Sequence, residues 1–443
     1  RPIWEGGRYN GDETSRFDAL RLAMDLGANH IDIELKAAHE FYSYLNGERP
    51  GRCKIIVSSH NYDCTPEVEE LGNLVARIQA AGADIVKFAT TALNITDVAR
   101  VFQISVHCQI PIIALVMGER GLISRLLCPK FGGYLTFGTL EAGKVSAPGQ
   151  PTIDELLNLY NFRLINTDTK IYGIIGKPVS QSKSPKLFNR AFKEDGYNGA
   201  YVHLLVDDVP QFFKTYASPD FAGFSCTMPH KEAALSCCDD VDPIAKSIGA
   251  VNCVIRGAND GKLYGYNTDY IGAICAIENA FKVFGVAGSS RSPLSGKLFV
   301  VIGAGGAGRA LAYGAKAKGA RVVIANRTLD RGRELAGIVG GEAISLAELG
   351  SYRAESGMIL ANTTSIGMAP RVEESPVPKE VLKYYEVVFD AVYSPRMTRL
   401  LREAEECGAK IVTGLDMLIG QAYEQYERFT GLPAPKQLFQ EIM

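Results

Sequence analysis

The feature that most constrains this fold is a strand, a glycine-rich turn, a helix and a second strand in succession over residues 297–328. The segment reads KLFVVIGAGGAGRALAYGAKAKGARVVIANRT, and apolar strand candidates follow it as MILANTT, VVFDAVY and KIVTG. Strands that alternate with helices in this way are typical of parallel α/β sheets. We therefore expect residues 271–414 to form one α/β domain built around the glycine-rich turn.

A repeating pattern occupies residues 1–165. Five short β-rich runs end near Leu35, His60, Thr90, Met117 and Gly138, with amphipathic stretches between most of them. Strands that arrive every ~25–30 residues with helical crossovers predict parallel βα units. Polar residues such as Glu34, His60 and Lys87 stand at the strand ends, as on the carboxyl-end face of a TIM-type barrel. Because a closed barrel of this type needs eight strands, we expect an incomplete, five-strand βα barrel.

A further group of strand candidates lies in residues 166–270. It contains IYGIIG, AYVHLLV, AGFSCTMP and GAVNCVI, each bounded by turn residues. The closing segment DMLIGQAYEQYERFTG is amphipathic, which indicates a helix that returns to cover an earlier domain. We expect residues 166–270 and 415–443 to form one domain together.

The composition excludes several classes of protein. The 443 residues are too many for one compact core, and 47% hydrophobic with 22% charged residues is typical of soluble globular domains. A formal net charge of −2 gives no reason to expect nucleic acid or a membrane surface as a partner. The apolar runs fall short of the ~20 residues that span a bilayer. Ten cysteines without a CxxC pair or a Cys/His cluster predict no metal site and a reducing compartment.

The glycine-rich turn predicts a dinucleotide site. Gly303 permits the tight turn, Gly305 lets the backbone approach a pyrophosphate, and Gly308 lets helix and strand pack closely. The helix N-terminus then offers free N–H groups to phosphate. Arg327 stands where an NAD site usually places an acidic residue, and a guanidinium can hold the 2′-phosphate of NADP. A packing turn without a ligand and an ordinary surface arginine are the alternatives.

Polar residues in the group at 166–270 predict a substrate site. They are Ser182, Ser184, Thr227, Lys231, Asn252, Asn267 and Asp269. Hydride transfer to a ketone needs a proton donor at the oxygen, and Lys231 held near Asp269 can supply one. Hydroxyl, amide and carboxylate groups suit a small polyhydroxylated acid. Read singly, each residue could equally serve as a cap or a turn.

His60 and Lys87 predict a second reaction. Both end apolar runs, so they should project from the carboxyl ends of adjacent parallel strands. Burial favours the neutral form of a lysine, which can attack a ketone and form an iminium. A neighbouring histidine can remove the proton that the iminium makes acidic. The alternative is a histidine at the barrel mouth and a solvated lysine.

The motifs SKSP, PHK, GAVN, NTD, GAGGAG, NRT and GQAYEQ follow one another as in shikimate dehydrogenases, which the chain resembles from about Ile171 to its end. The resemblance implies a Rossmann domain that binds NADP, with Lys231 and Asp269 as the catalytic pair. It implies that the substrate is bound by Ser182, Ser184, Thr227, Asn252, Tyr393 and Gln421. It implies that the cofactor is bound by Gly303, Ala304, Gly305, Gly306, Ala307, Gly308, Asn326, Arg327, Thr328, Asn362, Thr363 and Gly414. Gln181 departs from the family, which commonly has His there, so a preference for quinate stays open.

The motifs SSHNYD, VKFA, MGERGLISR, YLTFGT and SAPGQ resemble type I 3-dehydroquinate dehydratases, in the same order. The resemblance implies a Schiff base on Lys87, with His60 as general base and then acid. It implies substrate contacts from Arg1, Glu34, Met117, Arg125, Ser146 and Gln150. Relative to this family the first three barrel strands are missing, so we expect weak or no dehydratase activity from the chain as it stands.

Both resemblances in this order are those of the bifunctional dehydroquinate dehydratase–shikimate dehydrogenases of plants, and they span the whole chain. The pairing has a chemical logic, because the dehydratase product, 3-dehydroshikimate, is the ketone that the dehydrogenase reduces. The resemblance implies NADP as the cofactor, no metal, a monomer, and a soluble protein of the plastid stroma. The alternative hypothesis keeps only a dehydrogenase, for shikimate or quinate, and treats residues 1–165 as an inactive scaffold.

Overall fold

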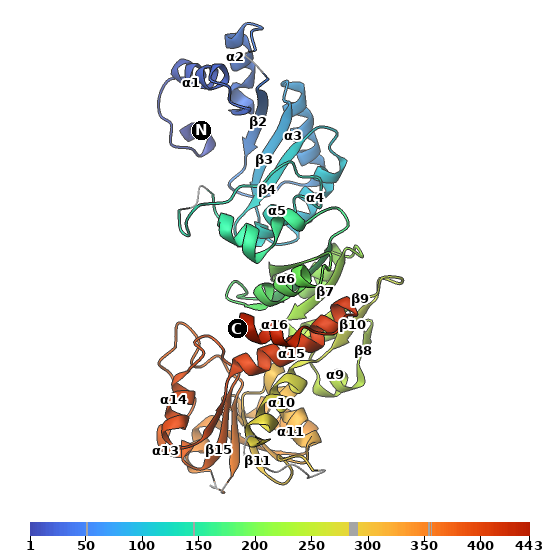
Figure 1. Cartoon of the computed structure of the whole chain (residues 1–443), viewed down its shortest axis with the longest axis vertical. Helices are drawn as coiled ribbons and strands as arrows, with labels where there is room; N and C mark the ends of the chain where they lie inside the picture. The colour runs from blue at the N-terminus through green and yellow to red at the C-terminus, as the bar shows by residue number, and fades with distance from the viewer. Residues whose placement is uncertain (50–51, 145–146, 283–290, 353–354, 356) are drawn as a thin grey trace. The chain divides into compact units, whose positions relative to one another are not determined.

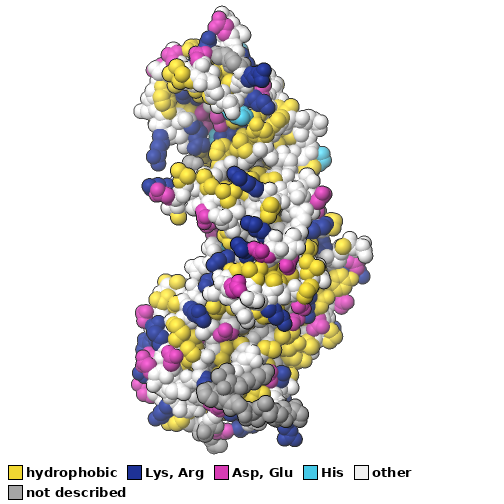
Figure 2. Space-filling model, viewed as in Figure 1, with side chains coloured by type: hydrophobic (Ala, Val, Ile, Leu, Met, Phe, Trp, Pro, Cys, Tyr) yellow, Lys and Arg dark blue, Asp and Glu magenta, His cyan; other side chains and the backbone are white. Residues whose placement is uncertain are grey.

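The computed structural model describes residues 1–49, 52–144, 147–282, 291–352, 355 and 357–443. These residues form two compact units, Arg1–Phe221 and Ala222–Met443 (Figure 1). Within the described ranges, no helix combines the length and the apolar character needed to cross a bilayer. On the face drawn in Figure 2, lysine and arginine side chains are interspersed with aspartate and glutamate. The predicted boundaries of three domains stay predictions.

The first unit begins with four parallel strands in the order β1-β2-β3-β4. The strands are β1 (His30–Glu34), β2 (Lys54–His60), β3 (Ile85–Thr91) and β4 (Ile112–Met117). The helical elements around them are η1 (Ile3–Glu5), α1 (Glu13–Asp25), α2 (Leu35–Leu45), α3 (Val68–Ala80), α4 (Asp97–His107), η2 (Glu119–Gly121) and α5 (Leu122–Leu126). Figure 1 shows α3 and α4 on the same side of the sheet. Parallel pairing brings the carboxyl ends of all four strands to one edge.

The predicted fifth strand, residues 134–138, does not join this sheet, so the expected five-strand barrel is corrected to four paired strands. Tyr134 N donates to Ile112 O (2.7 Å) at the start of β4. Further along, Thr139 N donates to Pro151 O (3.0 Å) instead of extending a ladder with β4. The segment therefore leaves β4 after this bond, because its next backbone partner lies in the following loop.

Strands β3 and β4 place a single charged residue inside the sheet. Every residue of β4 is buried, and β3 reads IVKFATT with only Lys87 and Thr91 partly exposed. A parallel sheet that is covered on both faces has such continuous apolar strands. Lys87 is the exception in this apolar layer, so its side chain has to meet a partner or a ligand at the carboxyl-end edge.

The remainder of the first unit is a second, smaller group of elements. They are the π-helical turn η3 (Glu155–Leu159), η4 (Phe162–Leu164), β5 (Lys170–Gly176), α6 (Ser184–Glu194), β6 (Gly199–Leu205) and α7 (Val209–Thr215). β5 and β6 pair in parallel along their whole length. α6 begins at Ser184 with proline in its first turn, where the missing N–H leaves no bond unmade. The loop of residues 177–183 that joins β5 to α6 carries Ser182.

The second unit opens with a mixed set of strands. β7 pairs antiparallel with β9, β9 pairs antiparallel with β10, and β10 pairs parallel with β8. The elements are β7 (Phe221–Cys226), α8 (Lys231–Cys237), β8 (Asp240–Val241), α9 (Pro243–Ile248), β9 (Cys253–Arg256) and β10 (Leu263–Tyr266). The turn after β7 leads into α8, and the turn after β10 leads into α10, so these two turns place Lys231 and Asp269 at helix starts.

A six-stranded parallel sheet in the order β13-β12-β11-β14-β15-β16 confirms the α/β fold predicted around the glycine-rich turn. Its strands are β11 (Leu298–Ile302), β12 (Arg321–Asn326), β13 (Glu342–Ser345), β14 (Met358–Asn362), β15 (Tyr385–Asp390) and β16 (Lys410–Val412). The helices beside them are α10 (Asp269–Lys282), α11 (Gly306–Ala317), α12 (Leu329–Val339), η5 (Leu346–Ser351), α13 (Lys379–Leu382) and α14 (Arg399–Glu406). The strand order reverses between β11 and β14, and such sheets bind ligands at this point.

The last helices, α15 (Gly414–Thr430) and α16 (Lys436–Ile442), close the second unit. α15 packs closely on α10, because both helices carry glycine where they cross. A Cβ on Gly272 would lie 2.7 Å from Met417 O, and a Cβ on Gly420 would lie 2.9 Å from Gly272 Cα. The missing side chains let the two backbones approach, and the adjacent Gln421 is carried into the interior with them.

Candidate active sites

The carboxyl-end edge of β1–β4 surrounds a cavity of about 350 Å³. Its lining residues are Arg1, Asp32, Glu34, His60, Lys87, Ala89, Leu115, Met117, Arg125, Phe137 and Ala147. Six of them were predicted from the sequence as dehydratase residues, so the structure brings those six together. Ser146 lies outside the described residues, and the lining described here does not include Gln150.

Lys87 stands between a carboxylate and an aromatic ring. Its Nζ lies 2.5 Å from Asp32 Oδ2 and 4.9 Å from the centre of the Phe137 ring. Both contacts hold the nitrogen in one place at the cavity. The Lys87 side chain is only 13% exposed, and it lines the cavity.

His60 is held by Glu5. Glu5 Oε1 accepts a hydrogen bond from His60 N (2.7 Å) and lies 3.3 Å from His60 Nδ1. An ionised carboxylate can only accept, so Nδ1 carries the proton of the neutral ring. The lone pair is then on Nε2, which makes that atom the one able to remove a proton from a bound substrate.

Arg125 and Glu34 differ although both are buried in this cavity. Glu34 Oε2 accepts from Arg16 Nη1 at 2.5 Å, so its charge is neutralised within the protein. Arg125 is 2% exposed, and its Nε finds no hydrogen-bond partner among the described residues. Burial lowers the pKa of Arg125 to about 10, which still leaves it charged at neutral pH. A buried cation with an unused donor is costly, so this arginine suits an anionic ligand group.

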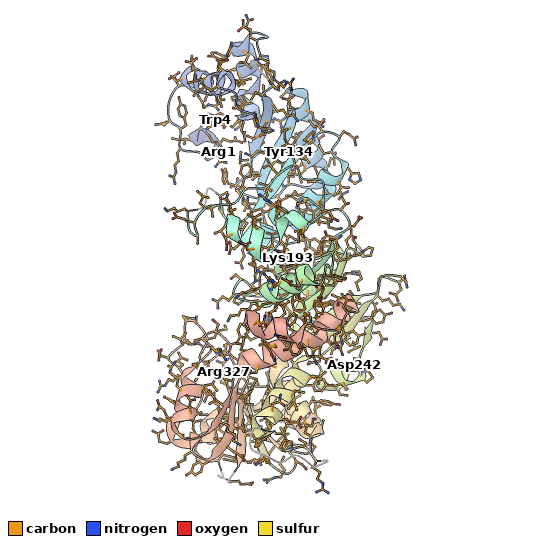
Figure 3. The ribbon with its side chains drawn as sticks, in the orientation of Figure 1. Arg1, Trp4, Tyr134, Lys193, Asp242 and Arg327 are labelled. Atoms are coloured by element: carbon orange, nitrogen blue, oxygen red, sulfur yellow. The ribbon has the colours of Figure 1, made fainter. Side chains whose placement is uncertain are left out.

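The sequence interpretation missed three side chains that contact Lys87 or His60: Glu5, Asp32 and Phe137. Asp32 had a signal, because it stands two residues before Glu34 and so shares its face of β1. Phe137 lay in a segment that we expected to be a strand. Glu5 had no such signal in the sequence, since it belongs to a short 3-10 turn 55 residues before His60. Arg1 and Trp4, labelled in Figure 3, belong to the same N-terminal segment.

A second lysine–aspartate pair lies in the second unit. Lys231 at the start of α8 donates through Nζ to Asp269 Oδ2 at the start of α10. The side chains are 13% and 7% exposed, respectively. The structure therefore brings together the two residues that the PHK and NTD motifs predicted as a pair. The pair can hold a proton at Nζ for transfer to a substrate oxygen.

The glycine-rich turn lies directly beside this lysine. A Cβ on Gly306 would stand 2.8 Å from Lys231 Cδ, so the lysine side chain passes over the turn. Gly303 has φ of +105°, which only glycine adopts easily, and a Cβ on Gly308 would lie 2.2 Å from Gly303 O. A Cβ on Gly305 would meet nothing within 4 Å, which leaves open space beside the backbone at the start of α11. These features fit a pyrophosphate at the helix N-terminus.

Arg327 follows β12 at the edge of this space. It is exposed, and no ion pair of Arg327 is found in the described part of the chain. Asn326 Nδ2 donates to Thr328 O (2.7 Å), which shapes the turn that carries the arginine. Arg327 is labelled in Figure 3. A guanidinium that no described carboxylate engages at this strand end fits the 2′-phosphate of NADP.

A buried polar network connects two of the predicted substrate residues. Asn252 Oδ1 accepts from Thr268 N (2.7 Å), and Asn252 Nδ2 lies 3.4 Å from Gln421 Oε1. Gln425, which the sequence interpretation missed, donates to the same Gln421 oxygen (2.6 Å). Thr227 follows β7 and is partly buried. The structure therefore brings Asn252 and Gln421 together through one network.

The ends of β14 and β15 are joined through a buried carboxylate. Asp390 accepts hydrogen bonds from Asn362 Nδ2 (3.0 Å), Val392 N (3.0 Å) and Thr398 Oγ1 (2.7 Å). Burial raises the pKa of Asp390 to about 7, against the lowering effect of these donors. Asn362 is a predicted cofactor residue, so Asp390 fixes a loop at the cofactor edge of the sheet.

Four family models match this chain. Residues 1–167 match type I 3-dehydroquinase, and residues 174–254 match the shikimate dehydrogenase substrate binding domain. Residues 286–390 match shikimate/quinate 5-dehydrogenase, and residues 414–443 match the shikimate 5'-dehydrogenase C-terminal domain. The order of the matches is the order of the motifs in the sequence.

A curated relative from Arabidopsis thaliana carries both activities in its name. It is the chloroplastic bifunctional 3-dehydroquinate dehydratase/shikimate dehydrogenase, 65% identical over 446 residues, which cover 100% of this chain and 74% of the relative. The chain belongs to this bifunctional family. The alternative of a dehydrogenase alone, with residues 1–165 as an inactive scaffold, is not favoured, because residues 1–167 match the dehydroquinase model and the relative is named for both activities.

Single-function relatives match the dehydrogenase part of this bifunctional chain. The NADP(+) shikimate dehydrogenase of Pyrococcus furiosus is 39% identical over 282 residues, which cover 63% of this chain and 97% of the relative. The structure of the Thermus thermophilus shikimate 5-dehydrogenase in complex with NADP(H) and shikimate is 35% identical, with a TM-score of 0.52. That match covers 62% of this chain and 98% of the other. Both relatives support NADP as the cofactor.

Proposed function

We propose that this chain dehydrates 3-dehydroquinate to 3-dehydroshikimate and reduces 3-dehydroshikimate to shikimate with NADPH. The dehydratase part departs from the weak or absent activity expected from the sequence, because six of the predicted dehydratase residues line one cavity. The observation that carries the proposal is that each unit has a partly buried lysine–aspartate pair beside a site built for a different task. Lys87 faces a cavity with a histidine and a buried arginine whose Nε has no partner among the described residues. Lys231 lies against a glycine-rich turn at a helix N-terminus. The product of the first reaction is the ketone that the second requires.

In the dehydratase, Lys87 forms a Schiff base with the ketone of 3-dehydroquinate. Nζ attacks the carbonyl carbon and the carbonyl oxygen leaves as water, which gives a positively charged iminium. His60 Nε2 removes the proton next to the iminium carbon and then protonates the departing hydroxyl, which also leaves as water. Hydrolysis releases 3-dehydroshikimate and restores Lys87. Arg125 binds the substrate carboxylate, because it is a buried cation of the cavity with an unused donor at Nε.

In the dehydrogenase, Lys231 protonates the ketone oxygen as the hydride arrives, and Asp269 holds its ammonium in place. The bound NADPH supplies the hydride. Gly303, Gly305 and Gly308 shape the turn for the pyrophosphate, and Arg327 holds the 2′-phosphate. Ser182, Ser184, Thr227, Asn252, Tyr393 and Gln421 stay the proposed substrate residues.

Location and assembly follow from the family. The Arabidopsis relative is described as chloroplastic, so we expect this chain in the plastid, in the stroma. The monomer that the family resemblance implies stays part of the proposal. The substrates are small acids, and we expect no nucleic acid or membrane as partner.

Borohydride trapping tests the dehydratase. The chain is incubated with 3-dehydroquinate, reduced with borohydride, digested and mapped by mass spectrometry. We expect the reduced adduct on Lys87 and not on other lysines, because Lys87 is the lysine that lines the described cavity. Absence of the adduct under conditions in which shikimate oxidation still proceeds would contradict the dehydratase and leave the dehydrogenase standing.

Parallel assays with shikimate and quinate test the dehydrogenase. Gln181 replaces a histidine common in the family, and it lies exposed in the loop that carries Ser182. We expect NADP+ to be reduced with shikimate at a kcat/KM at least about 10-fold above that with quinate, the selectivity of one buried hydrogen bond. A larger kcat/KM with quinate would show that the loop is built for the second substrate.

A further inference from the structure

The loop of residues 177–183, which carries Ser182 and leads into α6 at Ser184, is held by groups that neither reaction uses. Within it, Ser182 N donates to Val179 O (3.0 Å) and Ser184 N lies 3.3 Å from Ser182 Oγ. The carbonyl oxygen of Ser182 lies 3.0 Å from Nε2 of His203 on β6. His203 therefore fixes the backbone at Ser182 from the neighbouring strand.

Chemistry determines the direction of each hydrogen bond at His203. A carbonyl oxygen can only accept, so His203 Nε2 carries the proton. Burial lowers the pKa of His203, which keeps the ring neutral at neutral pH and leaves Nδ1 as an acceptor. Tyr160 OH lies 2.7 Å from Nδ1, and burial raises the pKa of Tyr160, so the hydroxyl stays protonated and donates. Two hydrogen bonds with the same donor direction therefore connect Tyr160 to His203 and His203 to the carbonyl of Ser182.

Tyr160 belongs to the dehydratase part of the chain. It follows η3 and lies within residues 1–167, which match the dehydroquinase model. Ser182 and His203 lie within residues 174–254, which match the shikimate dehydrogenase substrate binding domain. A dehydratase residue thus supplies the first donor of a chain that ends in the dehydrogenase loop.

The beginning of the same loop is tied to the dehydratase by a second contact. Arg120 of η2 donates to the Asp207 carboxylate through its Nε (2.6 Å) and its Nη2 (2.8 Å). Lys177 Nζ lies 2.8 Å from Oδ1 of the same carboxylate. Arg120 and Lys177 together hold the pKa of Asp207 well below its usual range. Lys177 is the first residue after β5, so both ends of the loop are tied to dehydratase residues.

We propose that Tyr160 and His203 are positioning residues of the dehydrogenase, through which the dehydratase part holds the Ser182 loop in the conformation that binds shikimate. This inference rests on the proposed role of Ser182 and Ser184 as substrate ligands. Without the Tyr160 hydroxyl, Nδ1 of His203 loses its donor and the ring is free to turn away from Ser182. Substrate binding weakens as a result, whereas proton transfer by Lys231 is untouched.

Steady-state oxidation of shikimate by Tyr160→Phe in the full chain tests the proposal. We expect the KM for shikimate to rise about three- to tenfold, the size of one neutral hydrogen bond, while kcat and the KM for NADP+ change less than about twofold. His203→Leu should raise the same KM. His203→Gln should restore it, because the amide nitrogen can still donate to the Ser182 carbonyl.

Tyr216→Phe is the matched control. Tyr216 OH also donates from the α7 region to a backbone carbonyl of the dehydratase part, Ile95 O at 2.6 Å, but this contact does not reach the loop. The control should lose thermal stability like Tyr160→Phe and keep the wild-type KM for shikimate. Equal KM values for all variants and the wild type, or equal rises in Tyr160→Phe and Tyr216→Phe, would overturn the proposal.

Ser182→Ala separates this inference from the proposed function. If Ser182→Ala leaves the KM for shikimate unchanged, the substrate role of the loop is wrong and the inference fails with it. If Ser182→Ala raises that KM while Tyr160→Phe and His203→Leu do not, the substrate role stands and only the positioning role is wrong.

Discussion

The two units contain the same ion pair and use it for different chemistry. Lys87 meets Asp32 in the first unit, and Lys231 meets Asp269 in the second. Both lysine side chains are 13% exposed, so burial does not distinguish them. Lys87 has to attack a carbonyl carbon, whereas Lys231 has to give a proton to an oxygen. The difference lies in what surrounds each pair.

The partner carboxylates and the neighbours of the two pairs differ. Asp32 is 34% exposed and Asp269 is 7% exposed, so the Lys231 pair is shielded from water more fully than the Lys87 pair. Lys87 also shares its cavity with His60, which can take protons in its place. Lys231 lies against Gly306, where the dinucleotide is proposed to bind. The groups around each lysine–aspartate pair, and not the pair itself, therefore decide whether the lysine acts as a nucleophile or as a proton donor.

The largest effect is expected from Lys87→Ala. Without Nζ no Schiff base forms, so dehydratase kcat should fall by about 10⁴-fold or more. Shikimate oxidation should stay at the wild-type rate, because Lys87 takes no part in the chemistry of the second unit, and this serves as the test of folding. The assay follows the absorbance of 3-dehydroshikimate. Dehydratase activity above about 1% of wild type would show that this lysine is not the nucleophile.

Lys231→Ala is the corresponding test in the dehydrogenase. We expect kcat for shikimate oxidation to fall by about 10²- to 10⁴-fold, the usual contribution of a general acid or base. The dissociation constant for NADPH, measured by fluorescence titration, should change little, because the turn at Gly303–Gly308 is intact. Dehydratase activity is the internal control. A weaker NADPH complex with a nearly normal kcat would mean that Lys231 binds cofactor instead of transferring a proton.

Arg327→Ala tests whether Arg327 selects NADPH over NADH in the second unit. The KM for NADPH should rise about 10- to 100-fold, the loss of a charge-assisted contact to the 2′-phosphate, while the KM for NADH should hardly change. Steady-state rates with both nucleotides measure this. Arg331→Ala is a control, because Arg331 lies four residues later and pairs with Glu232. Equal changes for NADPH and NADH would remove Arg327 from the cofactor site.

The parts of the fold that could be predicted from the sequence are those in which neighbours along the chain decide the structure. The glycine-rich turn and its flanking strands predicted the parallel sheet, because GxGxxG geometry is local. Residues 134–138 were wrongly expected to be a paired strand. Their β-rich composition matched a strand, but Thr139 N donates to Pro151 O in a later loop, which a local pattern does not show.

The candidate sites show the same limit. His60, Lys87 and Arg125 lie on strands or helices with clear motifs, so the sequence predicted them. Glu5 was missed because its role depends on a 3-10 turn that reaches His60 across 55 residues. Asp32 was missed although Glu34 was predicted, because Asp32 lies within β1 and not at its end, where the polar residues of such a site were expected.

The smallest effect, and one on stability, is expected from Asp390→Asn. The pKa of this buried carboxyl is raised from 3.8 to about 7. Between these values the folded state holds a proton that the unfolded state has lost, so the stability of wild type falls as pH rises through this window, by up to about 4 kcal/mol. The amide of the variant does not titrate. Its oxygen can accept from Val392 and its nitrogen can donate to Thr398, so the fold is kept.

Hydrogen exchange of the β14 and β15 amides measures this, with variant and wild type compared at each pH so that intrinsic exchange cancels. The protection of Asp390→Asn relative to wild type should grow from pH 5 to pH 8. Asp207→Asn is the opposite control. Because the pKa of Asp207 is lowered, its stabilisation is present above the unfolded value of 3.8 and is lost only as pH falls below it, so its difference from wild type should stay constant over the same range. A constant difference for Asp390→Asn would mean that Asp390 is ionised throughout, held by its three donors despite its burial.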